Sequence, residues 1–279
     1  MSKQAILVSV GGGNMASAIL LGAIERGILR PDEVVVVDPN EVCRVRFAEV
    51  GVGTGEDLRV VGNRIGPLTQ LMLAVKPQVV GSIGALLKEV CDGTPGRILL
   101  SIMAGVTSQR IREVSGAGGV IRLMPNTPAR IGRGCTALSL GAGATEADAG
   151  LARRVFGAVG EVIDLDESLM DAFTAVAGSG PAYVFAMVEA LAAAGVAAGL
   201  PEQVASIAAR QTMVGGAGLL ERSEQTPGEL REAVTSKAGT TAAGLEALGA
   251  AGFAEAILGA VLAARDRGVE LGRASGNGS

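Results

Sequence analysis

Histidine is absent from this 279-residue sequence, and aromatic residues are scarce, with no Trp, one Tyr and five Phe. Without histidine, no Ser-His-Asp triad, histidine general base or histidine metal site can form. The cysteines Cys43, Cys91 and Cys135 lie far apart and form no CxxC pair, which argues against a zinc knuckle or a redox pair. We therefore predict a chain without a bound metal, in which the cysteines are buried as small hydrophobic residues.

Basic charge is also limited, because the chain has a formal net charge of −4 and no basic cluster. Nucleic-acid binding needs a positively charged surface, so we expect no nucleic-acid partner. The odd number of cysteines and a start that leads almost at once into a strand pattern favour a reducing compartment. We therefore expect a cytoplasmic protein.

One apolar stretch, residues 182–200, is long enough to cross a membrane. It contains Glu189, its second half is rich in small residues, and no aromatic belt or basic flank follows it. These features favour a helix buried in an interface, and we expect no membrane partner.

The first part of the chain alternates strand-like and helix-like segments. Apolar runs typical of buried parallel strands occur at 5–10, 33–38, 71–75, 97–102, 120–125, 135–140 and 162–165. Helical patterns at 15–27, 41–51 and 145–160 separate several of these runs. The alternation predicts an α/β fold with a doubly wound parallel sheet of the Rossmann type.

From residue 168 onward every segment has a helical pattern, with breaks at 178–181, 199–201, 225–229 and 236–241. Thr226, followed by Pro227 and Glu229, is typical of a capped helix start. Residues 272–279 are expected to be frayed. We therefore predict an α/β domain over residues 1–167 and an all-helical domain over residues 168–279.

The first strand runs into three glycines and then a helix. Gly11-x-Gly13-x-x-Ala16 fits the dinucleotide fingerprint, in which the first glycine permits a tight turn and the second lets a pyrophosphate approach. The helix start offers free N–H groups and a positive dipole end to the phosphates. A purely structural turn is the alternative.

Asp38 ends the second predicted strand, about 20 residues past the glycines, where an acid binds the ribose 2′-hydroxyl of NAD. The segment Asp38-Pro39-Asn40 also suits an ordinary strand-to-helix cap. The position favours NADH but leaves open the choice between NADH and NADPH.

Six motifs resemble those of the pyrroline-5-carboxylate reductases and stand in the same order: GGGNMA (11–16), LAVKPQ (73–78), SIMAGV (101–106), RLMPNTPA (122–129), AGSGPAYVF (177–185) and TSKAGTT (235–241). The resemblance covers nearly the whole chain. It implies a Rossmann domain followed by a helical dimerisation domain, and a homodimer that forms rings of dimers in some members. It also implies reduction of the cyclic imine 1-pyrroline-5-carboxylate to L-proline by NADPH or NADH, the last step of proline synthesis.

The resemblance assigns coenzyme contacts by motif. The residues implied are Gly11, Gly13, Asn14 and Met15 at the pyrophosphate, Asn63 on the adenosine side, Ala74, Val75, Lys76 and Pro77 at a strand end, and Ala104 and Gly105 beside the nicotinamide. We expect Lys76 to serve cofactor binding or structure rather than catalysis, because it precedes Pro77 and has no evident acid partner.

TSKAGTT resembles a segment that reads S-P-G-G-T-T in many family members. The resemblance implies that backbone N–H groups hold the substrate carboxylate at Ser236, Gly239, Thr240 and Thr241, and that the Thr241 hydroxyl points at the ring nitrogen. Lys237 and Ala238 depart from the family pattern. Lys237 either attracts the carboxylate or blocks the site, and Ala238 is unfavourable if the backbone there needs a positive φ. A capped helix start without ligand is the alternative.

Three other functions are compatible with a dinucleotide-binding domain. A β-hydroxyacid-type dehydrogenase needs a lysine on the first long helix of its second domain, and residues 151–236 contain none. A ketol-acid reductoisomerase needs clustered carboxylates for Mg²⁺, which Glu189 alone does not supply. A non-catalytic NAD(P)-binding paralogue remains an alternative because of the altered TSKAGTT segment.

Overall fold

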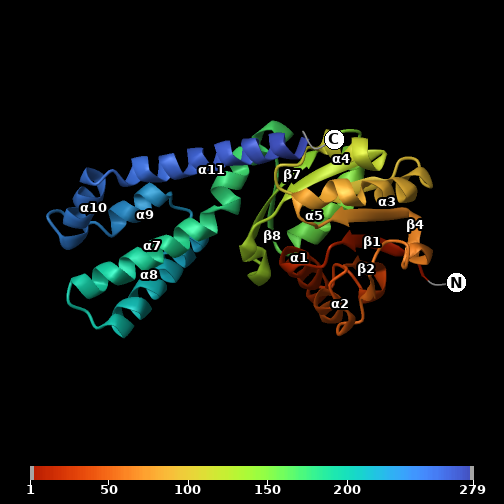
Figure 1. Ribbon diagram of the computed structural model, residues 1–279. Helices are drawn as coiled ribbons and strands as arrows, with labels where there is room; N and C mark the ends of the chain where they lie inside the picture. The colour runs from red at the N-terminus through yellow and green to blue at the C-terminus, as the bar shows by residue number, and fades with distance from the viewer. Residues whose placement is uncertain (1–2, 277–279) are drawn as a thin grey trace. The chain divides into compact units, whose positions relative to one another are not determined.

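The structure, a computed structural model, describes residues 3–276 of the chain (Figure 1). It divides into two compact units, residues 1–179 together with 264–279, and residues 180–263. The segment 168–179 belongs to the first unit because its side chains, such as the buried Met170 and Ala175, pack there. The two units defined by packing meet after residue 179. The boundary between the two predicted domains, after residue 167, stays a prediction.

An eight-stranded sheet forms the centre of the first unit, in the order β3-β2-β1-β4-β5-β6-β7-β8 (Figure 1). Its strands are β1 (Ala5–Val10), β2 (Val34–Val37), β3 (Gly53–Gly55), β4 (Ile65–Leu73), β5 (Ile98–Ser101), β6 (Gly119–Met124), β7 (Gly134–Leu140) and β8 (Gly160–Asp164). Strands β1 to β6 are parallel and have the strand order of dinucleotide-binding folds. This part of the sheet confirms the predicted Rossmann-type architecture.

The last two strands run in the opposite direction, so the predicted parallel sheet is mostly parallel and contains one antiparallel pair. Strand β7 pairs antiparallel with β6, and β8 pairs parallel with β7. The link between β6 and β7 contains only the short 3₁₀-helix η4 (Thr127–Ile131). A parallel connection needs a crossover of a dozen or more residues, so this short link turns the chain back.

Helices cover both faces of the sheet. The apolar cluster on one face includes residues of α1 (Asn14–Glu25), α2 (Glu41–Ala48) and α5 (Gly150–Gly157). The cluster on the other face includes residues of α3 (Val80–Asp92) and α4 (Ser108–Ser115). Burial on both faces explains why central strands are continuous apolar runs, as in β2, which reads VVVV and is buried throughout.

The three cysteines are free thiols. Cys91 is buried on α3, and burial raises the pKa of its thiol to about 11. Cys43 and Cys135 are half-buried, so the predicted burial is complete only for Cys91.

The sequence predicts a break in the helices at residues 178–181, but the structure has none there. It passes through η6 (Glu167–Leu169), α6 (Met170–Phe173) and the π-helical turn η7 (Thr174–Gly178) into α7 (Gly180–Ala197). Pro181 has no N–H for the carbonyl of Ala177, and Asn126 Nδ2 donates to that carbonyl at 3.0 Å. The π-helical turn and the Asn126 amide keep the helical path intact around the proline.

The second unit is helical throughout, as predicted. It contains α7, α8 (Glu202–Arg222), α9 (Pro227–Ala233), α10 (Thr240–Ala250) and the first part of α11 (Phe253–Gly276). Helix α9 begins with the predicted capping box, in which the Thr226 N–H donates to the Glu229 carboxylate at 2.7 Å. This backbone hydrogen bond lowers the pKa of Glu229.

Helix α11 continues to Gly276, so residues 272–276 are helical rather than frayed as predicted from the sequence. Residues 277–279 lie outside the described residues.

Helix α7 carries no buried residue within the chain, and apolar side chains such as Phe185 and Leu191 are exposed on it. By length and composition alone, the helical run Glu167–Ala197 could cross a membrane, as could α10 and α11 taken together as a bent pair. Exposed apolar surface of this kind marks an interaction site. The predicted burial of residues 182–200 therefore requires a partner.

Candidate functional site

The glycine turn after β1 is held tightly between two neighbouring strands. Gly11 has a φ of +103°, and a Cβ on it would lie 2.5 Å from the carbonyl oxygen of Ala74, just after β4. Its N–H donates to the carbonyl of Val37 at the end of β2, at 2.8 Å. Both the conformation and the lack of space require glycine at position 11.

Gly13 occupies a different environment. It is the N-cap of α1 with a φ of −67°, no side chain caps the helix, and a Cβ on it would meet no atom within 4 Å. The N–H groups of the first turn, which includes Asn14 and Met15, thus stand at the positive end of the helix dipole without a capping side chain. This cradle fits the pyrophosphate of a dinucleotide.

The Asp38 carboxylate accepts hydrogen bonds from two backbone N–H groups. Its Oδ2 accepts the N–H of Gly12 at 2.8 Å, and its Oδ1 accepts the N–H of Asn40 at 2.8 Å. The carboxylate therefore ties the glycine turn to the end of β2. A carboxylate has about four acceptor positions, so two backbone hydrogen bonds leave capacity for ribose hydroxyls.

A cavity of about 470 Å³ lies beside the glycine turn, at the carboxyl ends of β1, β2 and β4. Ligands bind at this edge in open α/β sheets. Six predicted coenzyme residues line the cavity: Gly11, Gly13, Asp38, Ala74, Val75 and Lys76. Pro77 opens the adjoining 3₁₀-helix η3 (Pro77–Val79).

Part of this cavity wall was not predicted. Asn63 lies exposed in the 3₁₀-helix η2 (Gly62–Arg64) and is not among the lining residues, whereas Glu56, Asp57 and Leu58 are. These three residues follow β3 directly. The signal that locates them is their place after a strand of the sheet, and it is available only once β3 is recognised.

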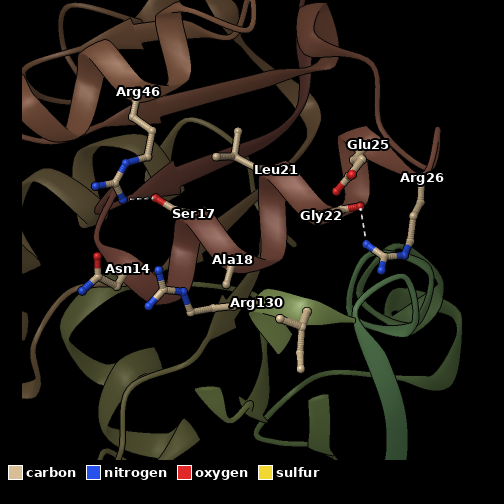
Figure 2. A pocket seen from close by; sticks show the side chains of 10 residues that line it. Asn14, Ser17, Ala18, Leu21, Gly22, Glu25, Arg26, Arg46 and Arg130 are labelled. Carbon is tan, nitrogen blue, oxygen red and sulfur yellow. Dashed lines mark hydrogen bonds between the residues drawn. The ribbon is translucent and has the colours of Figure 1, made fainter. Parts of the chain in front are cut away.

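A second cavity, of about 620 Å³, runs along the outer side of α1 (Figure 2). Asn14 lines it, and the guanidinium groups of Arg46 and Arg130 lie beside the first turns of the helix (Figure 2). Arg46 donates to the Ser17 hydroxyl at 3.0 Å. These cations add to the positive potential at the start of α1.

The predicted nicotinamide residues lie in the loop between β5 and α4. Ala104 is exposed, and Gly105 has a φ of +71°. A Cβ on Gly105 would lie 3.2 Å from the backbone nitrogen of Gly272 in α11. Glycine at position 105 therefore permits the close approach of this helix to the loop.

The segment before α10 has the local geometry of an uncapped helix start. Gly239 is the N-cap without a side-chain cap, and its N–H donates to the carbonyl of Ser236 at 3.0 Å. A Cβ on Gly239 would lie 2.2 Å from Ser236 Oγ. Thr240 and Thr241 are exposed in the first turn, and Lys237 is exposed beside them. The backbone N–H groups here suit a small carboxylate.

Ala238 adopts the conformation that the sequence analysis identified as unfavourable for alanine. Its φ of +57° is the only positive φ of a non-glycine residue among residues 3–276. The left-handed conformation costs an L-residue about 1–2 kcal/mol.

We expect Ala238→Gly to raise the free energy of unfolding by about 1 kcal/mol, because glycine adopts this φ without strain. Denaturant unfolding monitored by circular dichroism measures the change. Ala242→Gly, inside the first turns of α10, is the matched control and is expected to lower the free energy of unfolding by about 1 kcal/mol. Equal destabilisation by both substitutions would show that the positive φ imposes no strain.

A family model of the pyrroline-5-carboxylate reductase dimerisation domain matches residues 167–271. A pyrroline-5-carboxylate reductase of Synechocystis sp. is 41 % identical over 265 residues, which cover 95 % of this chain and 97 % of that protein. The chain belongs to the pyrroline-5-carboxylate reductase family. The enzyme of Pisum sativum is similar over 97 % of both chains, with 37 % identity.

Solved structures of the pyrroline-5-carboxylate reductase family share the whole fold. The enzyme from Coxiella burnetii has 32 % identity and a TM-score of 0.87, over 96 % of this chain and 99 % of that one. The Plasmodium falciparum enzyme, solved with NADP bound, has 26 % identity and a TM-score of 0.82, over 98 % and 99 %. The resemblance inferred from the six motifs is thereby confirmed, as is the fold of a Rossmann-type domain followed by a helical dimerisation domain.

A ketol-acid reductoisomerase from an uncultured archaeon has 13 % identity and a TM-score of 0.66. That likeness extends to the fold alone, and the described residues contain no cluster of three or more Asp, Glu, Cys or His that could hold a metal ion.

Proposed function

We propose that this chain reduces 1-pyrroline-5-carboxylate to L-proline with NADH or NADPH. The observation that carries the proposal is the presence of two uncapped helix starts in a member of this reductase family. One follows Gly11 and Gly13, and the other follows Ser236 and Gly239. Backbone N–H groups at such positions bind anions, and the two ligands of this reaction carry a pyrophosphate and a carboxylate.

The coenzyme-binding residues proposed are Gly11, Gly13, Asn14, Met15, Asp38, Ala74, Val75, Lys76, Pro77, Ala104 and Gly105. Asn63 stays a weaker assignment, because it lies outside the cavity lining. The coenzyme supplies a hydride when bound. The N–H groups at the start of α1 would hold its pyrophosphate, Asp38 would bind its adenosine half, and the loop that carries Ala104 would lie beside its nicotinamide.

The substrate-binding residues proposed are Ser236, Gly239, Thr240 and Thr241, whose backbone N–H groups hold the carboxylate. The reaction adds a hydride to the imine carbon and a proton to the ring nitrogen. The Thr241 hydroxyl donates a hydrogen bond to that nitrogen, and water supplies the proton. A cyclic imine accepts a hydride readily, so the main task of the protein is to orient the reactants. Orientation can lower a barrier by about 7–11 kcal/mol, which suits a site that contains no histidine.

The adenosine end of the cavity favours NADH. Asp38, Glu56 and Asp57 all line it. Glu56 is paired with Arg44 at 3.7 Å, so the carboxylates of Asp38 and Asp57 are the ones that oppose the approach of a 2′-phosphate. Among the described residues of this lining, Lys76 is the one basic residue. We propose that the enzyme uses both coenzymes and has the higher kcat/KM with NADH.

The direct test is the loss of NAD(P)H absorbance when 1-pyrroline-5-carboxylate is added to the purified protein. The proposal expects turnover with each coenzyme, a proline product and a higher kcat/KM for NADH. Coenzyme binding without turnover would identify the chain as a non-catalytic NAD(P)-binding paralogue. Turnover with a higher kcat/KM for NADPH would overturn only the coenzyme preference.

We further propose a cytoplasmic homodimer in which a second copy covers the exposed apolar side chains of α7, with neither a membrane nor a nucleic acid as partner. The presence of the family's dimerisation region at 167–271 supports this pairing. We expect a native mass of about twice the 27.9 kDa of the chain, or a larger even multiple for a ring of dimers. Light scattering without detergent measures this mass, and a stable monomer would contradict the pairing.

A further inference from the structure

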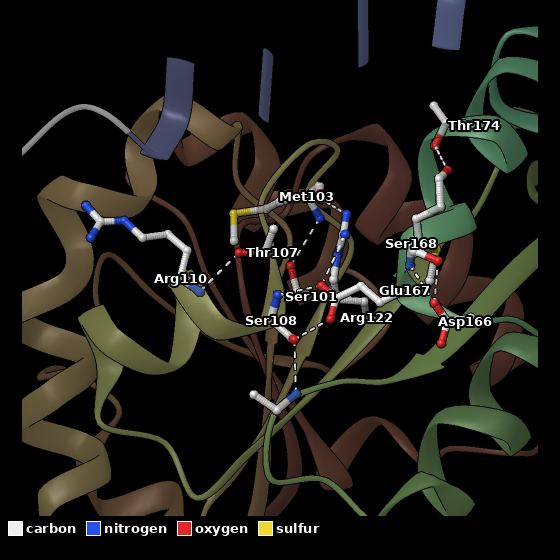
Figure 3. A network of polar contacts seen from close by, with 12 residues as sticks. Ser101, Met103, Thr107, Ser108, Arg110, Arg122, Asp166, Glu167, Ser168 and Thr174 are labelled. Carbon is white, nitrogen blue, oxygen red and sulfur yellow. Dashed lines mark hydrogen bonds and ion pairs between the residues drawn. The ribbon is translucent and has the colours of Figure 1, made fainter. Parts of the chain in front are cut away.

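A partly buried polar cluster joins three separate elements of the first unit (Figure 3). Oε1 of Glu167, in η6, accepts hydrogen bonds from the N–H of Ser108 at 2.7 Å and from Nη1 of Arg122 at 3.3 Å. Oε2 of Glu167 accepts a hydrogen bond from the Ser108 hydroxyl. The Ser108 hydroxyl accepts the N–H of Ala142 at 3.0 Å. Ser108 is 2 % exposed, and the Arg122 side chain is 8 % exposed.

The cluster fixes both ends of the loop 102–107. Ser108 is the first residue of α4, so the Glu167 carboxylate binds the N-terminus of the helix that follows the loop. At the other end, the Met103 N–H donates to Ser101 Oγ at 3.3 Å, and Nη2 of Arg122 lies 3.5 Å from the Met103 carbonyl oxygen. Ala104 and Gly105 stand between these attachments.

Stability alone is a weak reason for this arrangement. An ion pair with a buried partner loses much of its attraction to the cost of removing both charges from water, and apolar residues of similar volume often serve stability as well. The exposed pair of Arg153 with Glu146, at 2.8 Å, shows that the same unit also forms ion pairs in solvent. The distinctive property of the Glu167 cluster is that it ends on the loop that carries Ala104 and Gly105.

We infer that Glu167 is a positioning residue for hydride transfer, which holds the loop 102–107 against the nicotinamide half of the coenzyme. This inference rests on the proposed function, since Ala104 and Gly105 are assigned to the nicotinamide there. Arg122 and Ser108 act with Glu167, and none of the three contacts the reacting atoms. A nicotinamide displaced by about 1 Å would slow hydride transfer by about 10²-fold.

The test compares wild type with Glu167→Gln, which keeps the side-chain shape but removes the charge. ADP-ribose, which lacks the nicotinamide, serves as a probe of the adenosine half. We expect Glu167→Gln to bind ADP-ribose with unchanged affinity, to bind NADH more weakly, and to transfer hydride about 10²-fold more slowly in a single turnover. We expect Ser108→Ala, which keeps the ion pair and the backbone hydrogen bond, to slow hydride transfer by less.

Glu146→Gln removes the exposed ion pair with Arg153 and is the matched control, with wild-type binding and hydride transfer expected.

The unpaired charge of Arg122 could prevent folding of Glu167→Gln, and the double variant Glu167→Gln with Arg122→Met removes that charge. We expect this double variant to melt near the wild-type temperature and to keep the slow hydride transfer. A folded variant with wild-type hydride transfer, or with equal weakening of ADP-ribose and NADH, would overturn the inference. Wild type that binds NADH but does not reduce the imine would instead refute the proposed function, and the two binding measurements would still test the loop.

Discussion

Replacing Gly11 with alanine is expected to remove measurable NADH binding and to lower the melting temperature as well. The added Cβ would lie 2.5 Å from the Ala74 carbonyl oxygen, in a residue whose φ of +103° disfavours any side chain. Backbone strain and overpacking each cost about 1–3 kcal/mol, so we expect the free energy of unfolding to fall by about 3 kcal/mol. The displaced turn would move the start of α1 and with it the pyrophosphate cradle.

Gly13→Ala separates coenzyme binding from folding and is the matched control. A Cβ on Gly13 meets no atom within 4 Å, and its φ of −67° suits alanine, so we expect stability within about 0.5 kcal/mol of wild type. The methyl group would occupy the space left for the pyrophosphate, and we expect NADH to bind about 10²-fold more weakly, or about 2.7 kcal/mol. Fluorescence titration with NADH and thermal unfolding measure the two effects. Wild-type NADH affinity in Gly13→Ala would identify the turn as purely structural.

Thr241→Val is expected to lower kcat by about 10²–10⁴-fold, because the isosteric side chain cannot donate a hydrogen bond to the ring nitrogen. Thr241 is exposed in the first turn of α10, and Thr and Val have similar helix propensities, so the fold is expected to be retained. NADH affinity is expected to stay at the wild-type value because the substitution leaves the coenzyme cradle unchanged. Steady-state kinetics with saturating NADH measure the loss.

Thr241→Ser keeps the hydroxyl and is expected to retain most of the activity, which distinguishes loss of the hydrogen bond from a general disturbance of the helix start. If Thr241→Val turned over at the wild-type rate, the hydroxyl would have no role in the reaction. In that case the N–H groups of α10 would account for substrate binding, and orientation alone would account for the rate.

The parts of the fold that the sequence predicted are those with strong apolar signals. Strands such as β1 and β2 bury both faces and therefore read as unbroken apolar runs. Strand β3 was missed because it reads Gly-Thr-Gly at the edge of the sheet and has no apolar pattern. The residues that follow β3 in the cavity wall were missed for the same reason. The predicted strands 120–125 and 135–140 already leave a link too short for a parallel crossover, so the reversed direction of β7 was available from the sequence and was missed.

Local chemistry at single residues was harder to predict than the elements that carry it. The glycine turn was recognisable because the φ of Gly11 and its close approach to Ala74 demand glycine. The Glu167 cluster was not, because its members are far apart in the chain and each alone resembles an ordinary surface or capping residue. At Ala238 the sequence posed the question of a positive φ, and only the backbone could answer it.

The hydrogen bond from Asn126 to the Ala177 carbonyl makes two distant motifs mutually dependent. Pro181 leaves the carbonyl of Ala177 without its helical partner, and the side chain that repairs this loss stands 51 positions before Ala177 in the chain. A change at position 126 would expose the defect that the proline creates. A change at position 181 would remove the need for the Nδ2 hydrogen bond, while Asn126 Oδ1 would still accept the N–H of Cys135 at 2.9 Å. Mutational drift in either motif is thus constrained by the other.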